Sequence, residues 1–267
     1  MRASDYAELY AVEDDLWWFE GMRAVTAALL DPVCAPGSDR MILDAGCGTG
    51  ANLSWLARYA GAGRVVGIDA VATALRYCRQ RGRRDLAQGS VTALPFAPHT
   101  FHLVTSFDVL SHLPAPGADE RAIQEFHRVL RPGGIVFIRV AAHEWMRSDH
   151  DAALGTHRRY SLEELTMKTQ RAGLRVVRAT YANGLLLPMA ALQRHVLKRI
   201  GLGAGGSDVK PLPPAVRWLS RPFTWALRAE ARLLRRPGVK LRAGLSAICI
   251  AERGAALTSR AGCARRR

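Results

Sequence analysis

Short apolar runs alternate with longer amphipathic stretches over the first two thirds of the chain. Runs that end at glycine or polar residues predict strands, and apolar residues at a helical spacing predict helices. The expected strands are residues 41–45, 64–68, 85–90, 101–107, 135–141, 174–182 and 245–252. The expected helices are residues 14–30, 51–59, 73–81, 118–130 and 162–171. Because strands and helices alternate at this rhythm, we predict an α/β fold built from βαβ units, with a doubly wound, mostly parallel sheet.

A connection of about sixty residues separates the sixth expected strand from the last, which is far longer than usual. We expect this segment, residues 183–243, to be a basic helical insertion. It contains an apolar run around Pro188, a glycine-rich hinge at residues 201–206 and a helix at residues 215–236. The other expected parts are a helical cap, a core in two pieces and a disordered basic tail: residues 1–40, 41–182 with 244–253, and 254–267.

The composition fits a single α/β domain with a lid. The chain has 267 residues, of which 49% are hydrophobic, and this suffices for a sizeable core. Its five cysteines lack a C-x-x-C spacing, which favours a reducing compartment over disulfides or a zinc site. The acidic start is unlike a signal peptide, and the apolar run at residues 184–192 is too short to span a bilayer. We therefore expect a cytoplasmic protein.

Nearly all of the formal net charge of +15 lies in the last quarter of the chain. Residues 194–267 contain 17 basic and three acidic residues, whereas the preceding residues are almost balanced. Such an asymmetry indicates an interaction surface and does not decide the fold. Within residues 223–236, a helix would separate apolar from basic side chains: Phe223, Ala226, Leu227 and Leu234 on one face, and Arg228, Arg232 and Arg235 on the other.

Three interpretations of this basic helix stay open. Arginines flanked by Trp218 and Trp225 suit an anionic membrane, to whose inner face residues 194–236 would attach the protein. Alternatively, the helix packs its apolar face on the sheet domain as a lid. The charge also permits RNA binding, but neither aromatic-rich strands nor an RNA-binding module accompany it, so a nucleic-acid partner is less favoured. The sequence leaves the oligomeric state open.

The segment of residues 41–50, MILDAGCGTG, carries the first chemical signal. An apolar run followed by glycines at every second position predicts a strand that feeds a helix through a tight turn, where a ligand approaches the backbone. The glycines also fit a relaxed dinucleotide pattern. Asp44 opposes that interpretation, because a carboxylate repels a pyrophosphate and suits the cationic head of S-adenosylmethionine (SAM). Asp69, at the end of the next strand, is placed to bind ribose hydroxyls. The two acids together favour SAM.

The chain resembles the class I SAM-dependent methyltransferases, in their small-molecule, quinone-type branch. Five stretches carry the resemblance in the right order: LDAGCGTG (43–50), VVGID (65–69), GSVTALPF (89–96), FHLVTSFDVLSHL (101–113) and RVLRPGG (128–134). The resemblance implies SAM as the cofactor. It also implies a seven-stranded sheet with an antiparallel last strand, and the insertion expected at residues 183–243 lies between strands six and seven of that sheet.

The resemblance also assigns cofactor-binding residues along the chain. Those for the methionine end of SAM are Asp44, Gly46, Gly48 and Phe107, with Arg23 near its carboxylate; Asp69 and Ala70 would meet the ribose, and Ser90 and Val91 the adenine. Two of these positions need comment. Many relatives carry an acid at position 90, and serine accepts more weakly from the adenine amino group. An arginine on an N-terminal helix, like Arg23, commonly faces solvent.

The acceptor side is less explicit. Methyl transfer is an in-line displacement at a sulfonium, and a base is needed only when the acceptor must lose a proton. Residues 148–161 would form the substrate lid, and within them His157 and Asp151 are the candidate catalytic residues. A solvated loop is the alternative. His150, Asp151 and His157 are too small a set for a metal site, and His112 is expected to be a packed residue.

We therefore predict an enzyme that methylates a small or lipid-like acceptor, with oxygen favoured as the methylated atom. The expected strand at residues 101–107 is followed by Asp-Val-Leu rather than by the Asn/Asp-Pro-Pro-aromatic motif. This difference argues against methylation of a nucleobase amine. The alternatives are an RNA or protein methyltransferase that uses the basic C-terminal region, and a SAM-binding protein without turnover.

Overall fold

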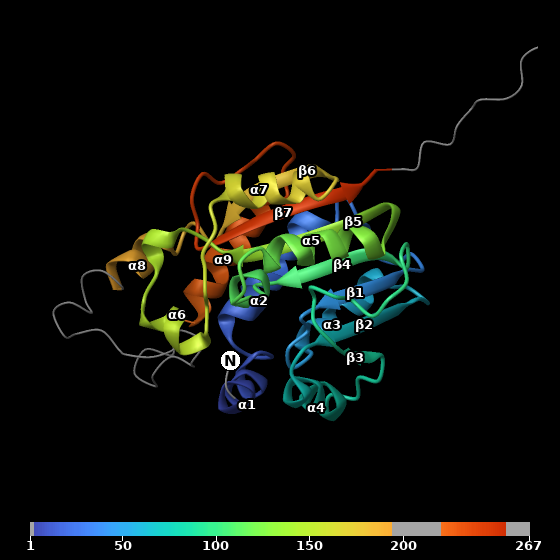
Figure 1. The fold of residues 1–267 in the computed structure, drawn as a ribbon. Helices are drawn as coiled ribbons and strands as arrows, with labels where there is room; N and C mark the ends of the chain where they lie inside the picture. Colours follow the sequence, from blue (N-terminus) through green and yellow to red (C-terminus); the bar gives the residue numbers. More distant parts are fainter. Residues whose placement is uncertain (1–2, 194–219, 255–267) are drawn as a thin grey trace, which may run out of the picture.

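The computed structural model describes residues 3–193 and 220–254, and it contains one seven-stranded sheet (Figure 1). The strands are β1 (Met41–Ala45), β2 (Arg64–Asp69), β3 (Leu86–Gln88), β4 (Phe101–Phe107), β5 (Leu130–Ala141), β6 (Leu174–Ala182) and β7 (Ser246–Arg253). Their order is β3-β2-β1-β4-β5-β7-β6. The first five strands pair in parallel, whereas β7 runs antiparallel between β5 and β6. The predicted fold class is confirmed.

Helices cover both faces of the sheet, as burial of two apolar faces requires. The longer ones are α1 (Ala3–Val12), α2 (Trp17–Leu30), α4 (Ala72–Gln80), α5 (Ala118–Val129), α7 (Leu162–Arg171) and α9 (Ser220–Leu234). The shorter ones are α3 (Ala51–Leu56), α6 (Asp149–Leu154) and α8 (Leu187–Leu192), with 3₁₀ turns at Ala57–Tyr59, Leu110–His112 and Glu144–Met146. One core lies between the sheet and the helices α5 and α7; the second lies between the sheet and α2, α3 and α9 (Figure 1).

Several element boundaries differ from the sequence prediction. The expected helix at 14–30 begins at Trp17, because Leu16 is extended, and α1 precedes it as a helix of its own. The expected helix at 51–59 ends as a 3₁₀ turn, and β5 begins at Leu130 because that residue already pairs with Phe101. The loop at 148–161 contains α6, which Ser148 and Asp151 start with a capping box.

The described part of the insertion contains the helices α8 and α9. Helix α9 packs against α2 on the same face of the sheet. Leu227 is fully buried there, and a Cβ on Gly21 of α2 would lie 2.3 Å from its Cδ1. The buried Glu230 accepts hydrogen bonds from the backbone N–H groups of residues 183–185. At the surface, an ion pair between Arg228 of α9 and Glu20 of α2 also joins the two helices. Helix α9 therefore packs its apolar face against α2, and its role as a lid stays a prediction.

The hinge predicted at 201–206, Trp218 and residues 255–267 of the predicted tail lie outside the described residues. Within residues 3–193 and 220–254, we find no helix whose length and hydrophobicity would suffice for a membrane span.

Leu227→Ala is expected to lower the free energy of unfolding by about 2–5 kcal/mol, because removal of buried methyl groups leaves a cavity against α2. Denaturation in urea, followed by circular dichroism, measures this loss. Leu233 on the same helix is 42% exposed, so Leu233→Ala serves as the matched control and should cost less than about 0.5 kcal/mol. Equal losses for the two variants would contradict the described packing of α9.

Candidate functional site

The glycine turn joins the carboxyl end of β1 to α3. Gly46, Gly48 and Gly50 have φ angles of 88°, 55° and 90°. Residues with a Cβ rarely adopt this backbone region. At Gly46 a Cβ would also lie 2.2 Å from Cγ2 of Val109. The backbone N–H groups of Gly46 and Cys47 donate to the carbonyl of Ile68 at the end of β2. The turn is thus held against the ends of two neighbouring strands.

Asp69 ends β2 and organises the backbone around it. Its Oδ2 accepts a hydrogen bond from the N–H of Gly48 at 3.0 Å, and its Oδ1 accepts one from the N–H of Val71 at 2.9 Å. Burial raises the pKa of this carboxyl, and the backbone donors oppose that rise. Ala70 is exposed next to it. The carboxylate therefore lies at the end of β2 beside the glycine turn, and its role toward the ribose stays a prediction.

Asp44 is the other carboxylate at this edge, and it is only 1% exposed. Thr105 donates to its Oδ1 at 2.9 Å, and its second oxygen receives no hydrogen bond from the described residues. Burial raises the pKa of Asp44 to about 7, although Thr105 and the charge of Arg139 lower it. A buried carboxyl with a single neutral donor gains most from a cation placed beside it. This environment fits the ammonium or sulfonium of SAM.

Helix α1 belongs to the helical cap predicted at residues 1–40, but its contact with the glycine turn was not anticipated: a Cβ on Gly48 would lie 3.9 Å from Cδ2 of Leu9. Tyr6 is buried, and burial together with the negative charge of Asp69 raises its pKa to about 12. The buried Glu13 accepts hydrogen bonds from the hydroxyl of Thr49 and from Arg81. Tyr6, Leu9 and Tyr10 at helical spacing after Asp5 were the available signal for this helix.

The residues predicted for the adenine end follow β3 along the same edge. The hydroxyl of Ser90 shares a hydrogen bond with the hydroxyl of Thr92 at 2.8 Å. It also accepts a hydrogen bond from the backbone N–H of Thr92. Val91 is buried in the core. The backbone N–H of Gly89 donates to the carbonyl of Asp69, which joins this turn to the end of β2. The turn that contains Ser90 therefore adjoins Asp69, and the roles of Ser90 and Val91 toward the adenine stay predictions.

Arg23 lies on α2, and its guanidinium is engaged with the turn between α1 and α2. It donates to the carbonyl of Glu13 at 3.3 Å and to that of Asp14 at 3.2 Å. These bonds hold α1 in its place beside α2. The role of Arg23 toward the cofactor carboxylate stays a prediction.

The structure corrects the expectation for Asp151. This residue is 1% exposed, and its two oxygens accept from Arg159 at 2.8 and 3.2 Å. It also accepts from the N–H of Ser148, so it starts α6. A buried carboxylate that is paired in this way holds the loop and is not placed to take a proton from an acceptor.

His157 and His112 belong to two segments that contact each other: His157 to the loop at 148–161 and His112 to the 3₁₀ turn Leu110–His112. The N–H of His157 donates to the carbonyl of Ser111 at 2.8 Å, and Nδ1 of His112 lies 3.1 Å from the carbonyl of Gly155. The imidazole of His157 is exposed and has no hydrogen bond to the described residues. The catalytic role of His157 stays a prediction, whereas the contact of His112 fits its expected structural role. The side chain of His150 lies outside the description.

A charged cluster that the sequence analysis missed lies next to Phe107, at the ends of β4 and β5. Arg139 is 6% exposed, and its Nε and Nη2 donate to Oδ2 of Asp108 at 3.0 and 2.7 Å. The guanidinium lies 5.2 Å from the ring centre of Trp18 and 5.0 Å from that of Phe107. The signal was an arginine inside the otherwise apolar stretch 135–141. Phe107 thus lies beside a cation that was not predicted, and its role toward the methionine end of SAM stays a prediction.

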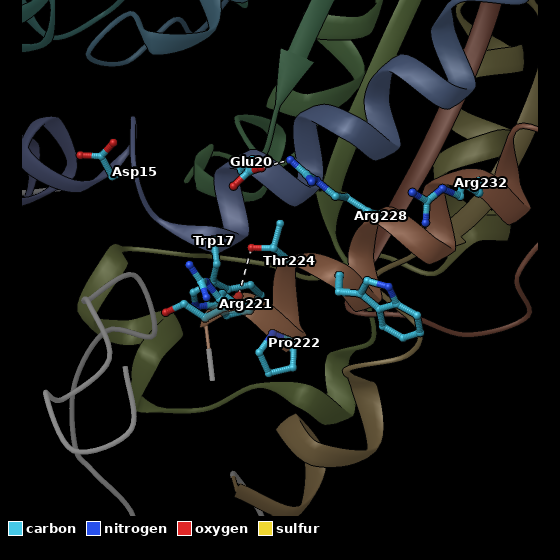
Figure 2. Close-up of a pocket in the computed structure, with 10 residues that line it drawn as sticks. Asp15, Trp17, Glu20, Arg221, Pro222, Thr224, Arg228 and Arg232 are labelled. Atoms are coloured by element: carbon cyan, nitrogen blue, oxygen red, sulfur yellow. Dashed lines mark hydrogen bonds and ion pairs between the residues drawn. The ribbon is translucent and has the colours of Figure 1, made fainter. Parts of the chain in front are cut away.

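A separate open hollow of about 600 Å³ lies between α9 and the start of α2 (Figure 2). Figure 2 shows the ion pair between Glu20 and Arg228 on its wall. The other residues that line the hollow are Asp15, Trp17, Ser220, Arg221, Pro222, Thr224, Trp225 and Arg232. None of the predicted cofactor residues is among them, so this hollow is a feature of the basic helix and not of the glycine turn.

Comparison with known proteins gives matches in the same part of the chain. A family model described as a methyltransferase domain matches residues 43–138. The 2-phytyl-1,4-naphtoquinone methyltransferase of Thermosynechococcus vestitus is 34% identical over 135 residues, which are 48% of this chain and 56% of that protein. The tRNA (carboxymethyluridine(34)-5-O)-methyltransferase of Arabidopsis thaliana is 32% identical over 122 residues, which are 45% and 27%.

Solved structures are similar over more of the chain. Phosphoethanolamine N-methyltransferase 2 of Haemonchus contortus, in complex with S-adenosyl-L-methionine, has a TM-score of 0.55 and 16% identity over 86% of this chain and 52% of that one. At this identity the likeness concerns the fold. The chain spans about half or less of the length of the curated relatives it matches.

Proposed function

We propose, on the premise that residues 43–138 belong to a class I SAM-dependent methyltransferase domain, that the chain methylates an oxygen of a small or lipid-like acceptor. SAM is the cofactor of this enzyme class. The observation that carries the proposal is the pair of carboxylates, Asp44 and Asp69, on either side of the glycine turn. Asp44 would bind the cationic methionine end of SAM and Asp69 the ribose hydroxyls.

The proposed reaction is an in-line displacement at the sulfonium. The acceptor oxygen attacks the methyl carbon, the carbon–sulfur bond breaks, and its electron pair stays on sulfur to give S-adenosylhomocysteine. Because the methyl group is already activated, the protein contributes chiefly by positioning the two reactants. Asp44, which is buried and fixed by Thr105, would hold one reactant at the end of β1. Phe107 would provide an apolar wall at the end of β4.

The lipid-like acceptor class is supported by the relative that acts on a phytyl-naphthoquinone. The test is release of S-adenosylhomocysteine by the purified chain on a panel of phenols, quinols and hydroxylated lipids. Methyl transfer to oxygen, located by mass spectrometry of the product, is the expected result. Transfer only to nitrogen or carbon would overturn the choice of oxygen. SAM binding without turnover on the whole panel would favour a SAM-binding protein that has no methyltransferase activity.

Methylation of RNA is the second candidate function, and the relative that acts on tRNA favours it. The basic surface of α9 would then meet phosphates. Turnover on bulk tRNA but not on the small-molecule panel, with binding that weakens steeply as salt rises, would favour this alternative.

We also propose that the enzyme is cytoplasmic and that the exposed face of α9 docks on the anionic inner surface of a membrane. Trp225 is 66% exposed and lies around one hollow with Arg221, Arg228 and Arg232. Within the described residues, Arg221 and Arg232 form no ion pair, so their charges are available to acidic headgroups. An exposed tryptophan among arginines suits the boundary between headgroups and acyl chains.

Sedimentation with vesicles tests this surface. The protein is expected to bind vesicles of phosphatidylcholine with phosphatidylglycerol more tightly than phosphatidylcholine alone. The triple variant Arg221→Gln, Trp225→Ala, Arg232→Gln should weaken binding by at least about tenfold, since each basic residue near the surface contributes about 1 kcal/mol. Arg175→Gln removes an exposed arginine of β6 and serves as the control. Equal binding to neutral vesicles, or no loss in the triple variant, would contradict the docking.

A further inference from the structure

We infer that the guanidinium of Arg139 binds the acceptor oxygen. The acceptor is therefore a compound with an acidic hydroxyl group, such as a phenol or an enol. This inference rests on the proposed function and narrows its substrate class. Arg139 is not one of the residues that would bind SAM. It lies on β5, directly paired in register with Phe107 of β4.

The position of Arg139 fits a group that meets the acceptor. The parallel strands β1, β4 and β5 are neighbours, and they bring Asp44, Phe107 and Arg139 to the carboxyl edge of the sheet. The charge of Arg139 lowers the pKa of Asp44, which indicates that the two groups lie within electrostatic reach. A group at this place is close to the carboxylate that would hold the methionine end of SAM.

The contacts of Arg139 leave one side of its guanidinium unused. Nε and Nη2 both donate to Oδ2 of Asp108, while Nη1 has no hydrogen bond to the described residues. The rings of Trp18 and Phe107 lie against the guanidinium and restrict its movement. Because a buried arginine is costly unless it is paired, the hydrogen bonds to Asp108 offset that cost and orient the guanidinium. Nη1 is thus a cationic hydrogen-bond donor whose position is fixed by Asp108 and by the two aromatic rings.

A fixed cation of this kind favours the nucleophilic form of an acidic hydroxyl. The acceptor loses its proton to solvent, and Nη1 of Arg139 donates to the resulting oxyanion. The oxyanion then attacks the methyl carbon of SAM, the carbon–sulfur bond breaks, and sulfur keeps the electron pair. The product is a neutral ether, which no longer pairs with the guanidinium and is bound more weakly. In this way one positioned charge selects the substrate and favours release of the product.

The direct test uses 4-nitrophenol, whose phenolate absorbs visible light and whose phenol does not. In the complex of the full chain with S-adenosylhomocysteine, binding should lower the pKa of the probe and favour its phenolate. Arg139→Met is expected to weaken phenolate binding about ten- to a hundredfold, because a hydrogen bond to a charged group is lost. Arg139→Lys, which keeps the charge, should retain part of the shift in the pKa of the probe. Arg175→Met removes an exposed arginine and is the matched control.

The readout does not depend on methyl transfer, so its failure is distinguishable from failure of the proposed function. Binding of S-adenosylhomocysteine and thermal unfolding show whether each variant is folded. A folded Arg139→Met variant that binds phenolate as tightly as the wild type would overturn the inference. So would a wild-type complex that binds no probe, or that binds it with an unshifted pKa. Loss of the shift in Arg139→Met, with retention in Arg175→Met, would support it.

Discussion

Asp69→Ala is expected to weaken SAM binding by at least about a hundredfold. The carboxylate of Asp69 would accept hydrogen bonds from the ribose hydroxyls, and each such bond to a charged group contributes about 1.5–3 kcal/mol. The same carboxylate accepts from the N–H groups of Gly48 and Val71, so its loss also loosens the glycine turn. Isothermal titration calorimetry of the purified chain with SAM measures the effect.

Two further variants give this prediction its controls. Asp85→Ala removes an exposed carboxylate just before β3, one that is 3.9 Å from Arg64, and it should leave SAM affinity unchanged. Asp69→Asn keeps an oxygen for one of the two backbone donors but loses the charge, so its SAM affinity should fall between those of Asp69→Ala and the wild type. Unchanged affinity in Asp69→Ala would show that the ribose is bound elsewhere.

SAM binding is expected to weaken about tenfold for each pH unit below about 7, and this dependence should come from Asp44. Burial raises the pKa of Asp44 to about 7 in the protein without cofactor. Below that pH the carboxyl is protonated, and a cationic ligand must displace the proton to bind. The α-amino group of the ligand stays charged over this range, because such groups have pKa values near 8. Binding below pH 7 should therefore release a proton.

The sign for stability is the opposite of the usual case for an aspartate. Because the pKa of Asp44 is higher in the folded than in the unfolded chain, its contribution is most favourable below pH 3.8 and is lost as pH rises through about 7. Calorimetry in buffers of different ionisation enthalpy measures the protons released on SAM binding. In Asp44→Asn the proton release and the pH dependence should both disappear. A variant that keeps the full pH dependence would place the titrating group elsewhere.

Elements with strong local signals were predicted closely. The helix at 162–171 has the predicted bounds, and Ser161 caps it by accepting from the N–H of Glu164. The strand at 101–107 also has its predicted bounds. In both cases the residues that determine where the element starts and ends are adjacent to it in the sequence. The bounds of helix α1 were missed because its packing depends on distant partners, such as the stacking of Tyr10 on Tyr77 of α4.

The same distinction separates the two halves of the candidate site. Gly46, Asp44 and Asp69 directly follow or end strands, so their place at one sheet edge could be predicted from the order of the elements. The surroundings of Arg139 could not be predicted, because Trp18 comes from α2 and Asp108 from the end of β4. Asp151 was misjudged for a related reason, since its pairing with Arg159 needs the fold of the loop between β5 and α7.

A calorimetric comparison of SAM with NAD as ligands of the purified chain tests the proposed cofactor site most directly. The glycine turn alone fits either cofactor, and the buried Asp44 decides between them, because it attracts a cation and repels a pyrophosphate. We expect one SAM to bind per chain and NAD to give no binding heat. Binding of NAD, or the absence of SAM binding, would contradict the assignment of this site.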